Sequence, residues 1–234
     1  DKYQPVSETI DYYPNSRSLA KLKSQFNWDE KRKELLWTKV VARKIQNQIK
    51  VLQNYNLVWD DVQNELDQME LNDSTNRETA AARKYFISMF GKDFIRRNSG
   101  VINAALDYGY AILLSAFNRE IAVNGYLSYL GIHHHSQENQ FNLGSDLMEP
   151  FRPFVDYWVK AHENIDEFTP DIKFGLVELL SLEIKFNGRK TLLSNAITVY
   201  VRDCLRFLSG EIDKIKIEME LTDEVPNDAI NDNV

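Results

Sequence analysis

The sequence contains few of the residues that make tight turns and cross-links. Its 234 residues include nine glycines and six prolines, about 6% of the chain, against roughly 12% in average proteins. β-Sandwiches, barrels and glycine-loop nucleotide folds need more turn residues, so the composition favours long helices joined by few, short connections. The single cysteine, Cys204, excludes an intrachain disulfide and a thiolate metal site, and it suits a reducing compartment such as the cytoplasm.

Long apolar runs are also absent. The longest uncharged apolar run, residues 108–117, is well short of the ~20 residues that a spanning helix requires, so we expect no membrane contact. The formal charge of −7 argues at first against a nucleic-acid partner. Residues 223–234 contain four acidic and no basic side chains, however, which leaves −3 for residues 1–222. The net charge therefore does not exclude DNA binding.

The spacing of apolar residues predicts one all-α domain over residues 28–221. Residues 1–27 are expected to form an irregular lead-in, and residues 222–234 an acidic, disordered tail. Pro150 and Pro153 should kink the helix that contains them. The predicted helices cover approximately residues 18–26, 29–54, 57–69, 76–90, 99–124, 143–161, 170–187 and 189–221, the last as one helix or a broken pair.

One acidic side chain lies on an apolar helix face. Glu78 shares its face with Ala82, Tyr85 and Met89 by the 3.6-residue period. An ionised carboxylate in such surroundings needs a cation. From spacing alone, an ion pair with an arginine of another helix and a metal ion are equally good candidates.

Two further segments carry metal-ligand residue types. His133-His134-His135 lies in a polar loop, where histidines are more often solvated than metal-bound. Asp146, Glu149, Arg152 and Asp156 share one face of the next helix, which taken alone predicts an ordinary solvated face. One histidine and two of these carboxylates, counting Glu78, would leave several positions open on a six-coordinate Mn²⁺ or Mg²⁺, an arrangement suited to phosphodiester chemistry.

Basic residues cluster on the predicted long helix. Arg32, Lys39, Arg43 and Lys50 are spaced 7, 4 and 7 residues apart and form a stripe away from its apolar side. Such a stripe could follow DNA phosphates, although a solvated helix face explains it equally well. The candidate DNA-binding residues are Arg32, Lys39, Arg43, Lys50, Arg77 and Arg83.

Three segments together resemble the CRISPR-associated integrase family, the catalytic subunit of spacer acquisition, and look most like the type II systems. Residues 76–86 (NRETAAARKYF) resemble the family's glutamate helix, and residues 103–110 (NAALDYGY) its N-x-x-L-x-Y-G-Y helix. Residues 131–134 (GIHH) with 146–153 (DLMEPFRP) and Asp156 resemble its histidine-acidic signature. Trp37, Lys44-Ile45 and Asn47-Gln48 also match, and the likeness extends in order from Lys21 to Phe207.

The resemblance implies a multi-helix catalytic lobe with Mg²⁺ or Mn²⁺ held by Glu78, His134 and Glu149. Glu149 departs from the aspartate that is common at this position but keeps the carboxylate. Asp146 matches an accessory acidic position, Arg152 could steer a phosphate, and His133 and His135 match no ligand position. Family members also carry an N-terminal β-rich domain that builds a homodimer, and we expect this chain to lack nearly all of it.

The implied reaction is the insertion of short DNA fragments into the CRISPR repeat array of a prokaryote, by attack of a 3′-hydroxyl on a phosphodiester. The implied partners are double-stranded DNA, a second copy of the chain and a small ferredoxin-like adaptation subunit. Type II systems add a ring-forming DNA-binding protein and the RNA-guided effector. Two alternatives remain at this point: a metal-dependent structure-specific nuclease acting on branched DNA, and a non-catalytic helical DNA-binding module.

Overall fold

The computed structural model describes residues 19–221 and confirms the predicted all-α class, with one small sheet added. The predicted boundaries within residues 1–18 and 222–234 lie outside the described residues. The helices are α1 (Leu19–Phe26), α2 (Glu30–Asn54), α3 (Asp60–Asp67), α4 (Arg77–Phe90), α5 (Val101–Val123), α6 (Asn142–Met148), α7 (Arg152–Ala161), α8 (Pro170–Glu178) and α9 (Leu193–Leu208), with 3₁₀ turns η1 (Leu71–Asp73), η2 (Glu149–Phe151) and η3 (Leu179–Ser181). The strands are β1 (Glu183–Phe186), β2 (Arg189–Leu192) and β3 (Met219–Leu221).

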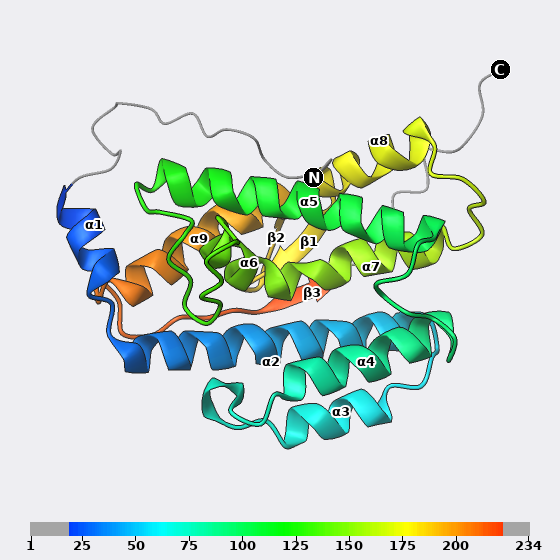
Figure 1. Cartoon of the computed structure of the whole chain (residues 1–234), viewed down its shortest axis with the longest axis horizontal. Helices are drawn as coiled ribbons and strands as arrows, with labels where there is room; N and C mark the ends of the chain where they lie inside the picture. The colour runs from blue at the N-terminus through cyan, green and yellow to red at the C-terminus, as the bar shows by residue number, and fades with distance from the viewer. Residues whose placement is uncertain (1–18, 222–234) are drawn as a thin grey trace.

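Two long helices, α2 and α5, enclose the layer that contains α6 and α7 (Figure 1). On the other side of α2 pack α3 and α4, so α2 contacts elements from both halves of the chain. Its inner face is completely buried at Leu36, Val40, Val41 and Ile45. Leu35, next to Leu36 in the sequence, lies off this face and is 46% exposed.

Helices α5 and α7 approach each other closely at a glycine. A Cβ atom on Gly109 would lie 2.4 Å from Cγ1 of Val155, so any larger residue would push α7 away. The close approach brings the neighbouring residues Tyr110 and Asp156 together in the core. The predicted kink in the helix over residues 143–161 is confirmed, because η2 separates α6 from α7 at Pro150.

The helices predicted over residues 170–187 and 189–221 are confirmed only in part, by α8 and α9, because a three-stranded antiparallel sheet interrupts them. Helix α8 ends at Glu178, and β1 and β2 form a hairpin in which Phe186 pairs with Arg189. The two-residue loop Asn187-Gly188 has positive φ at both positions, which suits the strand twist. Strand β3 pairs with β1 on the other edge, giving the order β2-β1-β3.

Within residues 19–221, none of the helices has the length and apolar character that crossing a bilayer requires.

The start of α4 is held by Asp73. Its carboxylate accepts hydrogen bonds from the backbone N–H groups of Arg77 (2.7 Å) and Glu78 (3.0 Å), which have no partner inside the helix. Asp73 also adopts a positive φ of 49°, a conformation that Asp and Asn tolerate better than Ala does.

We expect Asp73→Ala to lower the free energy of unfolding by about 1–2 kcal/mol, because the first turn of α4 loses its acceptor. Asp73→Asn, which keeps one acceptor oxygen and the backbone tolerance, should cost less. Denaturant unfolding measures both variants, with exposed Asp93→Ala as the control. Parental stability in Asp73→Ala would contradict this role.

Candidate metal centre

Two of the three predicted ligands meet at one buried lysine. The Lys44 ammonium, on α2, lies 2.5 Å from Oε1 of Glu78 on α4 and forms a second ion pair with Oε2 of Glu149 at the start of η2. The cation that Glu78 needs is thus a lysine, where an arginine or a metal ion was predicted. The two carboxylates are 71 positions apart in the sequence, yet they lie close enough together to pair with the same cation.

These groups are largely withdrawn from solvent. The exposed fractions of the side chains are 9% for Lys44, 19% for Glu78 and 5% for Glu149. Burial alone would raise the pKa of the Glu149 carboxyl, but the charges of Arg152 and Lys44 outweigh it and lower that pKa below its usual value. Burial likewise opposes the charge on Lys44, yet Glu149 and Glu78 raise its pKa. Opposite charges therefore favour the ionised forms of both Glu149 and Lys44.

The backbone around Glu149 is fixed by α2 as well. The side-chain amide of Asn47, one turn after Lys44, donates a buried hydrogen bond of 2.8 Å to the Pro150 carbonyl. Pro150 has no N–H group, and its carbonyl lies in the irregular turn between α6 and α7. Asn47 thus ties the segment that carries Glu149 to the helix that carries Lys44.

Arg152 connects the cluster to a second buried network. Its Nε lies 3.0 Å from Oε1 of Glu149, and its guanidinium lies 4.6 Å from the centre of the Tyr110 ring. The Tyr110 hydroxyl donates to Asp156, whose exposed fraction is 1%. Burial raises the pKa of Asp156 to about 6, although hydrogen bonds from tyrosine hydroxyls oppose the shift. The predicted solvated face is wrong, because Asp146, Glu149 and Asp156 are all buried.

The third predicted ligand, His134, is oriented by Asp146. Nδ1 of the His134 ring is hydrogen-bonded to Oδ1 of Asp146, which leaves Nε2 as the other ring nitrogen. This bond is the first cause of the raised pKa of His134, to which the charges of Glu149 and Glu78 also contribute. A carboxylate bonded to the far nitrogen of a histidine is the usual arrangement behind a histidine metal ligand.

The Asp146 carboxylate also shapes the loop that carries His134. Its exposed fraction is 0%, and it accepts hydrogen bonds from the backbone N–H groups of Ile132 (2.7 Å), His133 (3.0 Å) and His134 (3.3 Å). A Cβ atom at Gly131 would lie 2.3 Å from the His134 carbonyl oxygen and 2.7 Å from Oδ2 of Asp146. The loop therefore needs glycine at this position to close around the carboxylate.

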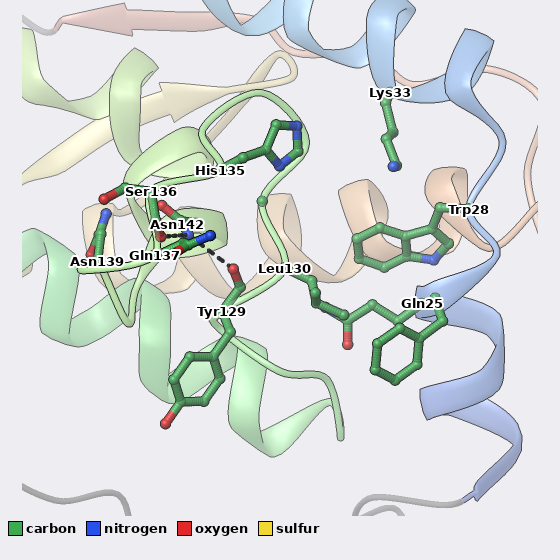
Figure 2. Close-up of a pocket in the computed structure, with 12 residues that line it drawn as sticks. Gln25, Trp28, Lys33, Tyr129, Leu130, His135, Ser136, Gln137, Asn139 and Asn142 are labelled. Atoms are coloured by element: carbon green, nitrogen blue, oxygen red, sulfur yellow. Dashed lines mark hydrogen bonds between the residues drawn. The ribbon is translucent and has the colours of Figure 1, made fainter.

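The two neighbouring histidines point to different surroundings. The His133 ring stacks on the buried Trp37 ring with 4.2 Å between the ring centres. Burial lowers the pKa of His133. His135 faces a pocket of about 370 Å³ between the start of α2 and the 129–142 loop, with Trp28 and Lys33 on the other side (Figure 2). None of Glu78, His134 and Glu149 lines this pocket.

The donor set can be tested against a metal ion. Within residues 19–221, no three His, Cys, Asp or Glu side chains are arranged as a metal-binding group. The ammonium of Lys44, however, stands between two carboxylates and marks a place where both can bind one cation. Two carboxylates and an imidazole are ligands that Mn²⁺ accepts, and Mg²⁺ takes oxygen ligands with water. Glu78, Glu149 and His134 are therefore suitable ligands for Mn²⁺ or Mg²⁺, provided that the Lys44 ammonium moves away from the two carboxylates.

The predicted stripe of Arg32, Lys39, Arg43 and Lys50 is wrong as one open surface, because Arg32 and Arg43 face other parts of the protein. Arg32 donates to the carbonyls of Phe207 and Ile212 (2.9 Å each) at the end of α9 and pairs with Asp213. Arg43 is partly buried near Glu218 and Glu220, and burial lowers its pKa. Arg77 pairs with Glu65 at 3.1 Å. Lys39, Lys50 and Arg83 remain exposed.

Sequence reasoning assigned no role to Lys44 itself. A signal was present, because Lys44 follows the buried Val40 and Val41 by four and three residues and so falls on the inner face of α2. A lysine there needs a buried carboxylate partner. The link from Tyr110 to Asp156 has no comparable signal, since it depends on how α5 and α7 are packed. Cys204 is a free, buried cysteine.

Comparisons with known proteins agree on one family. The family model described as "CRISPR associated protein Cas1" matches residues 8–196. A CRISPR-associated endonuclease Cas1 of Neisseria meningitidis is 32% identical over 97% of this chain and 75% of its own length. A Cas1 endonuclease of Francisella tularensis subsp. novicida is 28% identical over 80% of this chain and 68% of its own length.

Solved structures agree on the fold. A casposase bound to an integration product has a TM-score of 0.70 with 20% identity, covering 91% of this chain and 74% of that one. A Cas1 protein from Thermotoga maritima has a TM-score of 0.68 with 16% identity, covering 86% and 72%. The fold is thus the helical fold that Cas1 proteins and a casposase share. This chain belongs to the Cas1 family, as its family-model match and its Neisseria relative show.

The raised pKa of Asp156 gives a pH dependence with a definite sign. The folded protein binds the Asp156 proton more tightly than the unfolded chain does. Protonation of Asp156 therefore stabilises the fold fully below about pH 4, and this contribution to the free energy of unfolding is lost as pH rises through 6. The free energy of unfolding of the parent, relative to Asp156→Asn, should fall by at most about 3 kcal/mol between pH 4 and 7. Denaturant unfolding at each pH measures this difference, and a difference that stays flat would contradict it.

Proposed function

We propose that the protein is a metal-dependent DNA endonuclease and integrase of CRISPR adaptation. The observation that carries the proposal is the meeting of Glu78 and Glu149 at one cation, together with the His134 ring, which Asp146 orients and whose pKa both glutamate charges raise. Membership of the Cas1 family supports it, as does the endonuclease name of the Neisseria relative. The casposase with the same fold is bound to an integration product.

The proposed ligands of Mg²⁺ or Mn²⁺ are Glu78, Glu149 and Nε2 of His134. Such an ion, when bound, would polarise the phosphoryl group and offset the charge that develops on its oxygens. Asp146 keeps the His134 ring oriented through Nδ1. Arg152, in contact with Glu149, supplies the guanidinium that would bind a phosphate oxygen.

The proposed reaction is a transesterification. The oxygen of a DNA 3′-hydroxyl bonds to phosphorus of a phosphodiester in the CRISPR repeat, the hydroxyl proton is lost, and the bond from phosphorus to the former 3′-oxygen breaks. That oxygen takes up a proton, so the number of phosphodiester bonds is unchanged and no covalent enzyme intermediate is required. The residues of the centre then act by positioning and by charge stabilisation.

The proposed partners are double-stranded DNA, as the fragment and the repeat, a second copy of the chain and the small ferredoxin-like adaptation subunit. Structures of the same fold include a partial Cas6-RT-Cas1–Cas2 complex, at a TM-score of 0.67. The type II ring protein and the RNA-guided effector complete the proposed set, which would be met in the prokaryotic cytoplasm.

We expect Glu149→Gln to abolish Mn²⁺-dependent cleavage or joining while DNA affinity stays within about threefold of the parent. The amide keeps the size of the side chain but removes the charge that binds a cation. Cleavage of labelled DNA and binding in EDTA are measured on the same preparations. Parental activity in Glu149→Gln would reject the assigned centre.

A 3′-blocked DNA fragment separates integration from branched-DNA hydrolysis. Joining to a repeat-containing plasmid requires a free 3′-hydroxyl, so the 3′-blocked fragment should give no joined product while the 3′-hydroxyl fragment does. Equal plasmid cutting with both fragments and no joining would favour the structure-specific nuclease. DNA binding with neither product would favour the non-catalytic module.

The exposed lysines of α2 remain candidates for phosphate contacts. We expect the double variant Lys39→Ala/Lys50→Ala to weaken DNA binding and to reduce the slope of log affinity against log salt by up to about 2, because each phosphate contact contributes about 1. Lys185→Ala on β1, where the lysine pairs with Glu220, is the matched control. An unchanged slope in the double variant would mean that this face does not contact DNA.

A further inference from the structure

The position of Lys44 conflicts with the proposed metal site. Its ammonium lies between Glu78 and Glu149 and is closer than a typical hydrogen-bond distance to both. A lysine ammonium has three donors and no lone pair, so it cannot itself be a metal ligand. A Mg²⁺ ion that bridged the two carboxylates at about 2.0–2.1 Å would have to stand where the ammonium stands, and two cations at one position repel each other. The two cations therefore exclude each other.

We propose that Lys44 is an internal competitor of the divalent ion. The lysine occupies the cation position in the metal-free protein, and metal binding is an exchange in which the ammonium must leave. The proposal rests on the proposed function, because it takes Glu78 and Glu149 as the ligands. It adds that a residue of the chain sets how tightly the ion binds.

The burial of Glu149 explains why this carboxylate needs a cation even when no metal ion is bound. Glu149 is almost completely enclosed, and an enclosed carboxylate without a counter-charge is strongly unfavourable. Arg152 contacts one oxygen of Glu149, and Lys44 takes the other oxygen together with Glu78. The two carboxylates and two cations sum to zero charge. The ligand pair is thereby assembled before any metal arrives.

The geometry also allows the exchange. Lys44 reaches the carboxylates through a flexible four-carbon chain, so its ammonium can move several ångströms without a shift of α2. Glu78 is the more exposed of the two partners, at 19% against 5%, so the route to solvent lies on its side. A metal ion that must displace this cation binds with a lower apparent affinity than it would to free carboxylates.

Mn²⁺ binding to the full chain tests the proposal, by calorimetry or by electron paramagnetic resonance of the free ion. Lys44→Met keeps the length of the side chain but removes the cation, so its Mn²⁺ affinity should be at least tenfold higher than that of the parent. Lys44→Arg keeps a cation and should stay within about threefold of the parent. Lys31→Met, on an exposed face of the same helix, should leave the affinity unchanged.

An Mn²⁺ affinity of Lys44→Met that equals or falls below the parental value would overturn the proposal. Glu149→Gln separates this result from failure of the proposed function. If Mn²⁺ binds the parent and is lost in Glu149→Gln, the metal site stands and only the competitor role fails. If the parent binds no Mn²⁺, or if binding survives in Glu149→Gln, both fail.

The unmodified protein offers a second measurement if Lys44→Met does not fold. An amine-acylating reagent should modify Lys44 slowly in the metal-free protein, because the ammonium is buried and paired. Saturating Mg²⁺ should increase that rate at least fivefold, whereas the exposed Lys31 should react at the same rate in both states. Peptide mass spectrometry gives both rates. A Lys44 rate that is unchanged or lower with Mg²⁺ would overturn the proposal.

Discussion

The ion pairs of Lys44 with Glu78 and Glu149 are the interaction on which the rest of the centre depends. They join α2, α4 and η2, and each of these elements brings one charge to the same buried point. Removing any one of the three would leave an uncompensated charge in the core, which costs far more than loss of a surface ion pair. The arrangement therefore holds two carboxylates in place that would otherwise repel each other.

The surrounding structure supports this point from several directions. Asp73 fixes the first turn of α4 immediately before Glu78, and Asn47 holds the Pro150 carbonyl immediately after Glu149. The carboxylate of Asp146 accepts a hydrogen bond from the backbone of the loop that carries His134, and it also binds the His134 ring. Most of these contacts are hydrogen bonds to backbone groups in loops, in the η2 turn or in the first turn of a helix, which have no partner within a helix. Positioning of the site thus depends on irregular segments held by buried polar side chains.

The sequence predicts the helical class and most helix positions, because the 3.6-residue apolar period and the prolines act locally. It also singles out Glu78, His134 and Glu149 as a candidate ligand set, through residue type and family resemblance. The sheet was missed although Asn187-Gly188 is a strong hairpin signal, because the flanking strands are only four residues long. Contacts such as Arg32 with the end of α9, or Tyr110 with Asp156, depend on packing between distant segments and leave no local pattern.

A crystal structure of the protein with Mn²⁺ would show which cation the two glutamates bind, because anomalous scattering locates the ion without assumptions about its ligands. We expect one Mn²⁺ between the carboxylates of Glu78 and Glu149, with Nε2 of His134 as a further ligand and the Lys44 ammonium moved out. An ammonium still paired with both carboxylates, with Mn²⁺ bound elsewhere or absent, would contradict this expectation.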